Sequence, residues 1–175
     1  MKIRKANIQD AQGIGKVHVD SWRTTYKGIL PDDFLNKLSY EQRTELWKKY
    51  ISDASNYVLV AENEQDEIIG FATGGTRKTN SVPNATDLTS IYLLEEYQGL
   101  GIGKQLLKEI FAYFKQKGYK KVFVEVLAEN KTRNFYEYYG AQYVNNIEIK
   151  IGGKIVEELI YVWNDIDKVT NGALK

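Results

Sequence analysis

Three glycines alternate with other residues in the segment Gly99-Leu100-Gly101-Ile102-Gly103-Lys104. The segment lies between a predicted strand and a predicted amphipathic helix. Glycine lets the backbone turn so that several N–H groups point into one concavity, where the dipole at the helix N-terminus favours an anion. A diphosphate group is the ligand that such a turn predicts. The alternative is a tight turn without a ligand, although three alternating glycines cost backbone entropy that a plain turn does not require.

The spacing of these glycines excludes the two commonest phosphate-binding motifs. A P-loop requires a glycine five residues before its Gly-Lys pair and Ser or Thr after the lysine, and this chain has Gln98 and Gln105 there. A Rossmann fingerprint requires Gly-x-Gly-x-x-Gly, whereas this run is Gly-x-Gly-x-Gly and lies late in the chain. The diphosphate ligand is therefore expected to be of another kind.

Residues 98–103 (Gln-Gly-Leu-Gly-Ile-Gly) resemble the Gln/Arg-x-x-Gly-x-Gly/Ala motif of the GNAT N-acetyltransferase superfamily, which binds the pyrophosphate of acetyl-CoA. Residues 87–93, directly upstream, are similar to the fourth strand of that family. Downstream, the segment from Asn130 through Phe-Tyr-Glu at 135–137 to Gly140 resembles a third family segment. The resemblance covers residues 2–163, and Asn130 precedes Tyr136 by six residues where many members have seven.

The resemblance implies how acetyl-CoA is bound. In the family the fourth strand is splayed from the fifth, and the pantetheine arm inserts between them. Backbone groups of Ile91 and Leu93 are then the expected partners, with the Ile91 N–H at the oxyanion of the reaction. The residues expected to bind acetyl-CoA are Ile91, Tyr92, Leu93, Gln98, Gly99, Leu100, Gly101, Ile102, Gly103, Lys104, Asn130, Arg133 and Tyr136. Contacts to the 3′-phosphate from Lys104, Lys108, Lys131 or Arg133 stay open, because each could equally be a solvated charge.

Two further residues carry the expected proton chemistry. Tyr136 matches the family tyrosine that is proposed to protonate the departing thiolate, and a phenol with a pKa near 10 is a reasonable donor. The alternative is that Tyr136 only packs in the core. Tyr138 and Tyr139 are then the next candidates for the proton donor. Asp87 lies eleven residues before Gln98, where some members carry a glutamate general base. A bridging water would compensate for the shorter side chain, and the alternative is a solvated carboxylate at a strand end.

The acceptor side is expected in the aromatic segment 22–31. In the family this region covers the acceptor site, so Trp22 and Tyr26 are the predicted substrate-binding residues, with capping of the core as the alternative. His18 is expected to be a helix-face side chain rather than a catalyst, since nothing else in the sequence brings it to the thioester.

The elements that position these residues follow from hydrophobic periodicity and turn signals. Residues 22–30 show no clear periodicity and are interpreted as a loop or broken helix that ends at Pro31. The expected strands are residues 2–6, 57–61, 68–73, 85–94, 121–127, 142–151 and 154–163. The expected helices run from Asn7 to about Ser21, from Ser39 to about Tyr50, and over residues 101–117 and 131–139. This order implies a mixed α/β fold with helices on both faces of the sheet. The resemblance adds that the sheet has about seven mostly antiparallel strands, splayed between strands 4 and 5.

Composition limits the class of protein. The chain has 175 residues with a formal charge of +1 and is 43% hydrophobic, which predicts one domain over residues 1–165 followed by a loose tail at 166–175. Cysteine is absent and there is one histidine, so neither a thiolate nucleophile nor a cysteine–zinc site can form, and no metal is expected. Neutral charge gives no electrostatic argument for nucleic acid, and no apolar run is long enough to span a bilayer. With no visible signal peptide, a cytoplasmic protein is expected.

The most specific hypothesis is an acetyl-CoA-dependent N-acetyltransferase that acts by direct transfer in a ternary complex, because a thiol acyl-enzyme is impossible. Its expected partners are acetyl-CoA and an amine acceptor, with neither nucleic acid nor a membrane, and a homodimer stays open. The first alternative is a non-catalytic acyl-CoA-binding or sensory domain on the same scaffold. The second is a nucleotide-phosphate-binding enzyme, which competition by ATP but not by CoA would support. The identity of the acceptor amine is not encoded in the cofactor motif.

Overall fold

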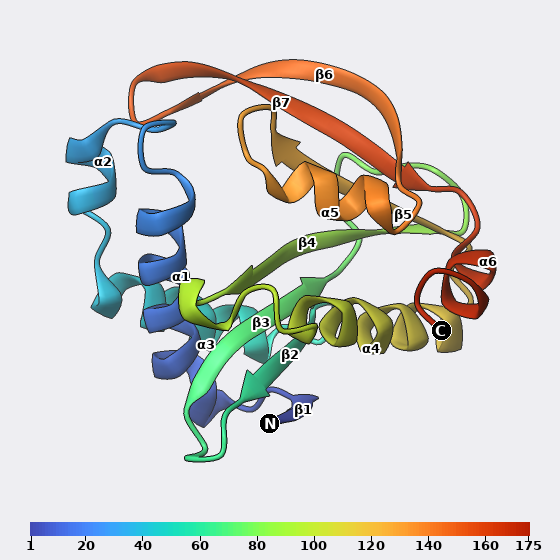
Figure 1. Ribbon diagram of the computed structural model, residues 1–175, viewed down its shortest axis with the longest axis horizontal. Coiled ribbons are helices and arrows are strands. Elements are labelled where there is room, and N and C mark those ends of the chain that lie inside the picture. The colour runs from blue at the N-terminus through green and yellow to red at the C-terminus, as the bar shows by residue number, and fades with distance from the viewer.

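One seven-stranded sheet runs through the computed structural model, which describes residues 1–175 (Figure 1). The strand order is β1-β2-β3-β4-β5-β7-β6, and every neighbouring pair is antiparallel except the parallel pair β4 and β5. The strands are β1 (Lys2–Lys5), β2 (Tyr57–Glu62), β3 (Ile68–Gly74), β4 (Ala85–Leu93), β5 (Lys121–Leu127), β6 (Gln142–Ile151) and β7 (Lys154–Trp163). The expected mixed α/β fold with a mostly antiparallel sheet is confirmed.

Helices cover both faces of this sheet, which explains why β2 is a continuous apolar run. Val58 and Val60 pack against α1 and α3, whereas Leu59 and Ala61, which alternate with them, belong to the core under α4. The helices are α1 (Ala11–Thr25), α2 (Asp32–Asn36), α3 (Tyr40–Ser52), α4 (Ile102–Gln116), α5 (Thr132–Tyr138) and α6 (Ile166–Asn171). None of them is both long and apolar enough to cross a bilayer.

The parallel pair β4 and β5 separates halfway along its length. The two strands pair only from Ala85↔Lys121 to Leu88↔Val124, and beyond this point they diverge (Figure 1). The register of β4 against β3 also skips Thr89, because Thr73 pairs with Ser90 and Gly74 with Leu88. One unpaired residue in a strand is a β-bulge, which bends the strand and increases its twist. The bulge therefore lies where β4 begins to lean away from β5, and the expected splay is confirmed.

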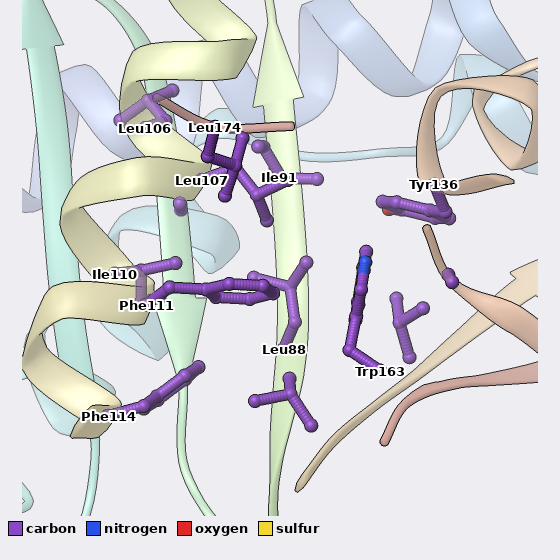
Figure 2. Packing of buried hydrophobic residues seen from close by; sticks show 14 of the residues in the cluster. Leu88, Ile91, Leu106, Leu107, Ile110, Phe111, Phe114, Tyr136, Trp163 and Leu174 are labelled. Atoms are coloured by element: carbon purple, nitrogen blue, oxygen red, sulfur yellow. The ribbon is translucent and has the colours of Figure 1, made fainter. Parts of the chain in front are cut away.

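Helix α4 holds the larger core together. Its buried side chains, Leu106, Leu107, Ile110, Phe111 and Phe114, point towards Leu88 and Ile91 of β4 (Figure 2). Leu88 and Ile91 are three residues apart and still share this face, since the bulge at Thr89 shifts the alternation of the strand. The position of β4 beside the N-terminal turn of α4 is thus fixed by apolar packing.

Most local signals are confirmed. Asn7 and Asp10 form a reciprocal capping box, and Ser39 caps α3 through the N–H of Gln42. Gly118 follows α4 with a φ of +85°, and the Gly152-Gly153 turn joins β6 to β7.

The segment 22–30, expected as a loop or a broken helix, divides into two parts: residues 22–25 are the last turn of α1, and turns follow from Tyr26 on. Tyr26 donates its N–H to the Trp22 carbonyl and packs into a separate apolar cluster with Leu30 and Leu35. One expectation is wrong. The last residues are not loose, since α6 and the segment after it pack on α4 with Ile166 and Leu174 fully buried.

Candidate active site

A cavity of about 480 Å³ opens between the unpaired half of β4, the glycine turn before α4, and α5. Its lining combines backbone from the turn with apolar and hydroxyl-bearing side chains, as a site for an extended, partly apolar ligand requires. The lining residues are Thr25, Ile91, Tyr92, Leu93, Gln98, Gly99, Gly101, Gly103, Lys104, Lys131, Thr132, Phe135 and Tyr139.

The glycine turn is built to present backbone N–H groups. Gly99 and Gly101 have φ values of +76° and +81°, the left-handed region in which L side chains are strained, and a Cβ built on either would meet no atom within 4 Å. Within the protein, no acceptor receives a hydrogen bond from the backbone N–H of any residue from 99 to 104. No side chain caps the start of α4 at Gly101 either. Unpartnered N–H groups at a helix N-terminus beside a cavity are the arrangement that an anion-binding site requires.

The outer half of β4 continues the cavity away from this turn. Ile91, Tyr92 and Leu93 line it, and they lie beyond Leu88, the last residue that pairs with β5. The edge of β4 that faces away from β3 thus has no strand partner at these residues. Free backbone groups on such an edge can bind an extended ligand as an added strand would.

Tyr136 of α5 is held next to this region. Its side chain is 5% exposed and packs edge-on against Trp163, with ring centroids 5.7 Å apart, and no group in the protein hydrogen-bonds its hydroxyl. Figure 2 shows its hydroxyl end turned to the side on which Ile91 lies. Burial, and to a smaller extent the neighbouring Tyr26, raise the pKa of Tyr136, while Arg77 lowers it slightly. Tyr136 is therefore protonated at neutral pH, although it is not among the side chains that line the cavity.

The aromatic residues of α1 pack behind the cavity. The hydroxyls of Tyr26 and Tyr92 hydrogen-bond over 2.8 Å, and the Trp22 and Tyr26 rings meet edge to face at 4.8 Å. Burial raises the pKa of Tyr92 well above its usual value, with Tyr26 as the next cause. Trp22 and Tyr26 do not line the cavity themselves, but Tyr92 does, so the pair lies one residue layer behind its wall.

His18 belongs to the same aromatic cluster and is a core residue. Its Nδ1 accepts a hydrogen bond of 3.0 Å from Trp47 Nε1, and its ring stacks on Tyr92 at an interplanar angle of 13°. Burial, and to a smaller extent the positive charge of Arg43, lower the pKa of His18 to about 3. His18 is therefore neutral near pH 7 and structural.

Asp87 lies away from the cavity. Its carboxylate accepts hydrogen bonds from the backbone N–H and the guanidinium of Arg77 and from the Asn80 amide, at 2.9 to 3.0 Å, and its residue is 3% exposed. It precedes Ile91 by four residues, on the order of 13 Å along the strand. These contacts make Asp87 the anchor of the loop between β3 and β4, and they leave its expected role as a base without geometric support.

Four other residues that were expected to bind acetyl-CoA also lie outside the cavity lining. Asn130 is buried, and its Oδ1 accepts from the Thr132 N–H at the start of α5. Ile102 points into the core under α4, Leu100 is 67% exposed, and Arg133 is exposed without a partner. None of these four side chains lines the cavity. The structure also has no group of three or more His, Cys, Asp or Glu side chains that could hold a metal ion.

The wall formed by α5 is larger than expected. Lys131, Thr132, Phe135 and Tyr139 occupy one face of this helix at spacings of three and four residues, the pattern of a single helix face. That spacing in the sequence could have identified the group. Thr25 had no signal, because it lies in the segment 22–30, which shows no clear periodicity.

Comparison with known proteins agrees with this geometry. The sequence model of the acetyltransferase (GNAT) family matches residues 19–141. The uncharacterized N-acetyltransferase YuaI of Bacillus subtilis (strain 168) is 37% identical over 164 residues, which cover 94% of this chain and 93% of YuaI. The spermidine N(1)-acetyltransferase of Thermoplasma acidophilum is 28% identical over 122 residues, or 67% of this chain and 73% of that protein.

Solved structures share the fold. The PaiA N-acetyltransferase of Thermoplasma acidophilum in complex with coenzyme A has a TM-score of 0.69 and 26% identity, covering 90% of this chain and 96% of that one. The ribosomal-protein-alanine N-acetyltransferase of Brucella melitensis has a TM-score of 0.74 at 21% identity, covering 94% and 99%. The chain therefore belongs to the acetyltransferase (GNAT) family and is an acyltransferase.

Proposed function

We propose that this protein transfers the acetyl group of acetyl-CoA to a primary amine of a small molecule or peptide, by direct attack in a ternary complex. The observation that carries the proposal is the run of unpartnered N–H groups at residues 99–104, in a cavity that continues along the unpaired edge of β4. A diphosphate fits the first feature and an amide-containing pantetheine arm fits the second. The complex of the related PaiA protein with coenzyme A supports this assignment.

The residues of the chain take the following roles in the proposal. The N–H groups of residues 99–104 bind the diphosphate, with Gln98 and Lys104 at its rim. The backbone of Ile91 and Leu93 aligns the thioester, and the Ile91 N–H stabilises the oxyanion that develops on its carbonyl. Tyr136 donates a proton to the departing thiolate, for which its raised pKa keeps it in the protonated form.

Proton balance requires a second group. An acceptor that arrives as an ammonium ion loses one proton before its nitrogen attacks and a second one as the amide forms. The second proton ends on the thiol of CoA, by way of Tyr136, and the first has to be accepted by a base. The contacts of Asp87 with Arg77 make it a poor candidate for that base.

The proposal includes several classes of acceptor amine. One relative is named for spermidine and another, from Haemophilus influenzae, for the alanine of ribosomal protein bS18. A polyamine and a peptide N-terminus are both primary amines, and both belong in the test.

The test measures CoA release with acetyl-CoA and a panel of polyamines, amino acids, aminoglycosides and peptides. Turnover with at least one amine, and double-reciprocal plots that intersect when both substrates vary, are the expected results. Parallel lines would indicate an acetyl-enzyme and would overturn direct transfer. CoA binding without turnover on any amine would support the non-catalytic acyl-CoA-binding alternative.

A further inference from the structure

The face of the sheet opposite α4 carries two carboxylates on adjacent strands. Leu127 of β5 pairs with Glu158 of β7, and Glu125 pairs with Ile160, so Glu125 and Glu158 are diagonal neighbours on one face. Leu127 belongs to an apolar cluster with Tyr26, which assigns this face to the side of α1 and α2. The two carboxylates therefore lie on the side of the aromatic pair Tyr26 and Tyr92.

Glu158 is the one of these acids that has no partner. Arg77 hydrogen-bonds Asp87 at 3.0 Å and contacts the Glu125 carboxylate through Nε at 3.5 Å. Glu158 is half-buried, and it makes neither an ion pair nor a hydrogen bond through its side chain. An unpaired, half-buried carboxylate beside a second carboxylate is unfavourable for stability, so a functional reason for keeping it is expected.

The charged and titratable groups around Glu158 come from three elements. Burial raises the pKa of Glu158, the negative charge of Glu125 on β5 raises it further, and Arg77 of the β3–β4 loop lowers it. Tyr26 at the end of α1 is electrostatically coupled to Glu158. On its other side β6 places the uncharged Ile147 opposite it. The two raising effects outweigh that of Arg77, so Glu158 is a stronger base than an exposed glutamate.

The proposed site of acetyl transfer and this face of the sheet meet where β4 and β5 separate. Glu125 is the first residue of β5 beyond the last pair with β4, so the carboxylates begin where the strands separate. Tyr26 hydrogen-bonds Tyr92, which lines the cavity. Tyr136 is 5% exposed, and its pKa is raised by burial and by Tyr26 and lowered by Arg77. A hydroxyl without a protein partner on a largely buried side chain leaves a hydrogen-bonding position for a ligand at this point.

We propose that Glu158 is the base that accepts the proton of the acceptor ammonium, directly or through one water, and that the acceptor approaches from the Tyr26 face of the splay. This proposal rests on the proposed function. The ammonium N–H bond breaks and its proton goes to a Glu158 oxygen, while the electron pair stays on nitrogen and attacks the thioester carbonyl. Glu158 then releases the proton to solvent when the products leave. Glu125 and Arg77 position and tune Glu158 and do not take the proton themselves.

The experiment compares Glu158→Gln with Glu157→Gln. Glu157 is the neighbouring residue in β7, exposed, on the opposite face of the strand and hydrogen-bonded to Asn146, so it is a matched control. For Glu158→Gln, kcat at pH 7 is expected to fall by about 10²-fold or more, with KM for acetyl-CoA and stabilisation by CoA unchanged. The loss should shrink as the pH rises, and it should be smaller for an acceptor whose amine is mostly uncharged at pH 7. Glu158→Asp should recover part of kcat.

Three results would overturn the proposal while leaving the proposed function intact. The first is wild-type kcat in Glu158→Gln. The second is a loss that is equal at every pH and for every acceptor, since this indicates a structural role. The third is a larger, pH-dependent loss in Glu125→Gln than in Glu158→Gln, which would assign the proton to Glu125. Absence of turnover in the wild-type protein would instead contradict the proposed function itself.

Discussion

Gly101 and Gly118 stand at the two ends of α4 in the same left-handed conformation, with φ values of +81° and +85°. A Cβ on either would meet no atom within 4 Å, so alanine at both positions has the same backbone strain and no steric clash. That strain is about 1–2 kcal/mol. In a domain of this size it corresponds to a fall in Tm of roughly 2–8 °C. Of these two glycines, Gly101 lines the cavity and Gly118 does not, which makes Gly118→Ala a matched control for Gly101→Ala.

The two variants should differ in their response to CoA. A methyl group at Gly101 stands where the diphosphate has to approach the backbone N–H groups. Losing one hydrogen bond to a charged group is worth about 1.5–3 kcal/mol, or a Kd weaker by roughly 10- to 150-fold. CoA at about 100 times the wild-type Kd stabilises the wild-type protein by ~2.7 kcal/mol. After a weakening of about 100-fold the same CoA concentration stabilises by only ~0.4 kcal/mol.

Thermal unfolding with and without CoA measures both the loss of stability from backbone strain and the stabilisation by CoA. Without CoA, Gly101→Ala and Gly118→Ala should unfold at similar temperatures below the wild type. With CoA, Gly118→Ala should show the full wild-type shift, and Gly101→Ala about half of it or less. A wild-type CoA shift in folded Gly101→Ala would refute the diphosphate site at this turn.

Three further variants test the remaining assignments. Tyr136→Phe should lower kcat by about 10²-fold or more with CoA binding intact, and a larger loss in Tyr139→Phe would instead assign proton donation to Tyr139. Asp87→Asn should destabilise the protein by about 1–3 kcal/mol in urea unfolding, because it leaves Arg77 without its buried partner, while kcat per folded molecule changes far less than in Tyr136→Phe. His18 has a folded-state pKa of about 3, below its unfolded value, so its contribution to stability is complete above pH 6.5 and is lost as the pH falls towards 3. That loss should reach about 2–3 kcal/mol at pH 4.5, and a His18→Asn variant should show a flatter dependence of unfolding free energy on pH; an unchanged dependence would contradict the buried, neutral state.

The Glu158 proposal changes how acceptor specificity should be sought in this protein. Tyr26, Glu125 and Glu158 come from three distant parts of the chain and meet on the face away from α4. An amine that carries a positive charge suits a face with two carboxylates, of which one is unpaired. Acceptor screens should therefore include cationic amines and be run over a range of pH, since a base with a raised pKa acts best close to that pKa.

Most of the local structure could be predicted from the sequence by itself. The glycine turn, the capping box at Asn7 and the Gly152-Gly153 hairpin depend on backbone preferences of a few adjacent residues. The apolar positions of α4 recur at helical spacing, so its buried face was also evident. The same local segment around Gly101 led to the cofactor turn of the family, because the chemistry of that turn is carried by its backbone.

Only the tertiary structure decided which side chains meet. Asp87 and Glu158 are both strand carboxylates in the sequence, and the position of Arg77 in a separate loop leaves one paired and the other free. The α1 helix extends to Thr25 and Leu174 is fully buried because distant apolar surfaces cover these segments, which no local pattern records. Ion pairing and burial depend on contacts between residues far apart in the chain, so the proposed cofactor turn could be identified from sequence and the proposed base could not.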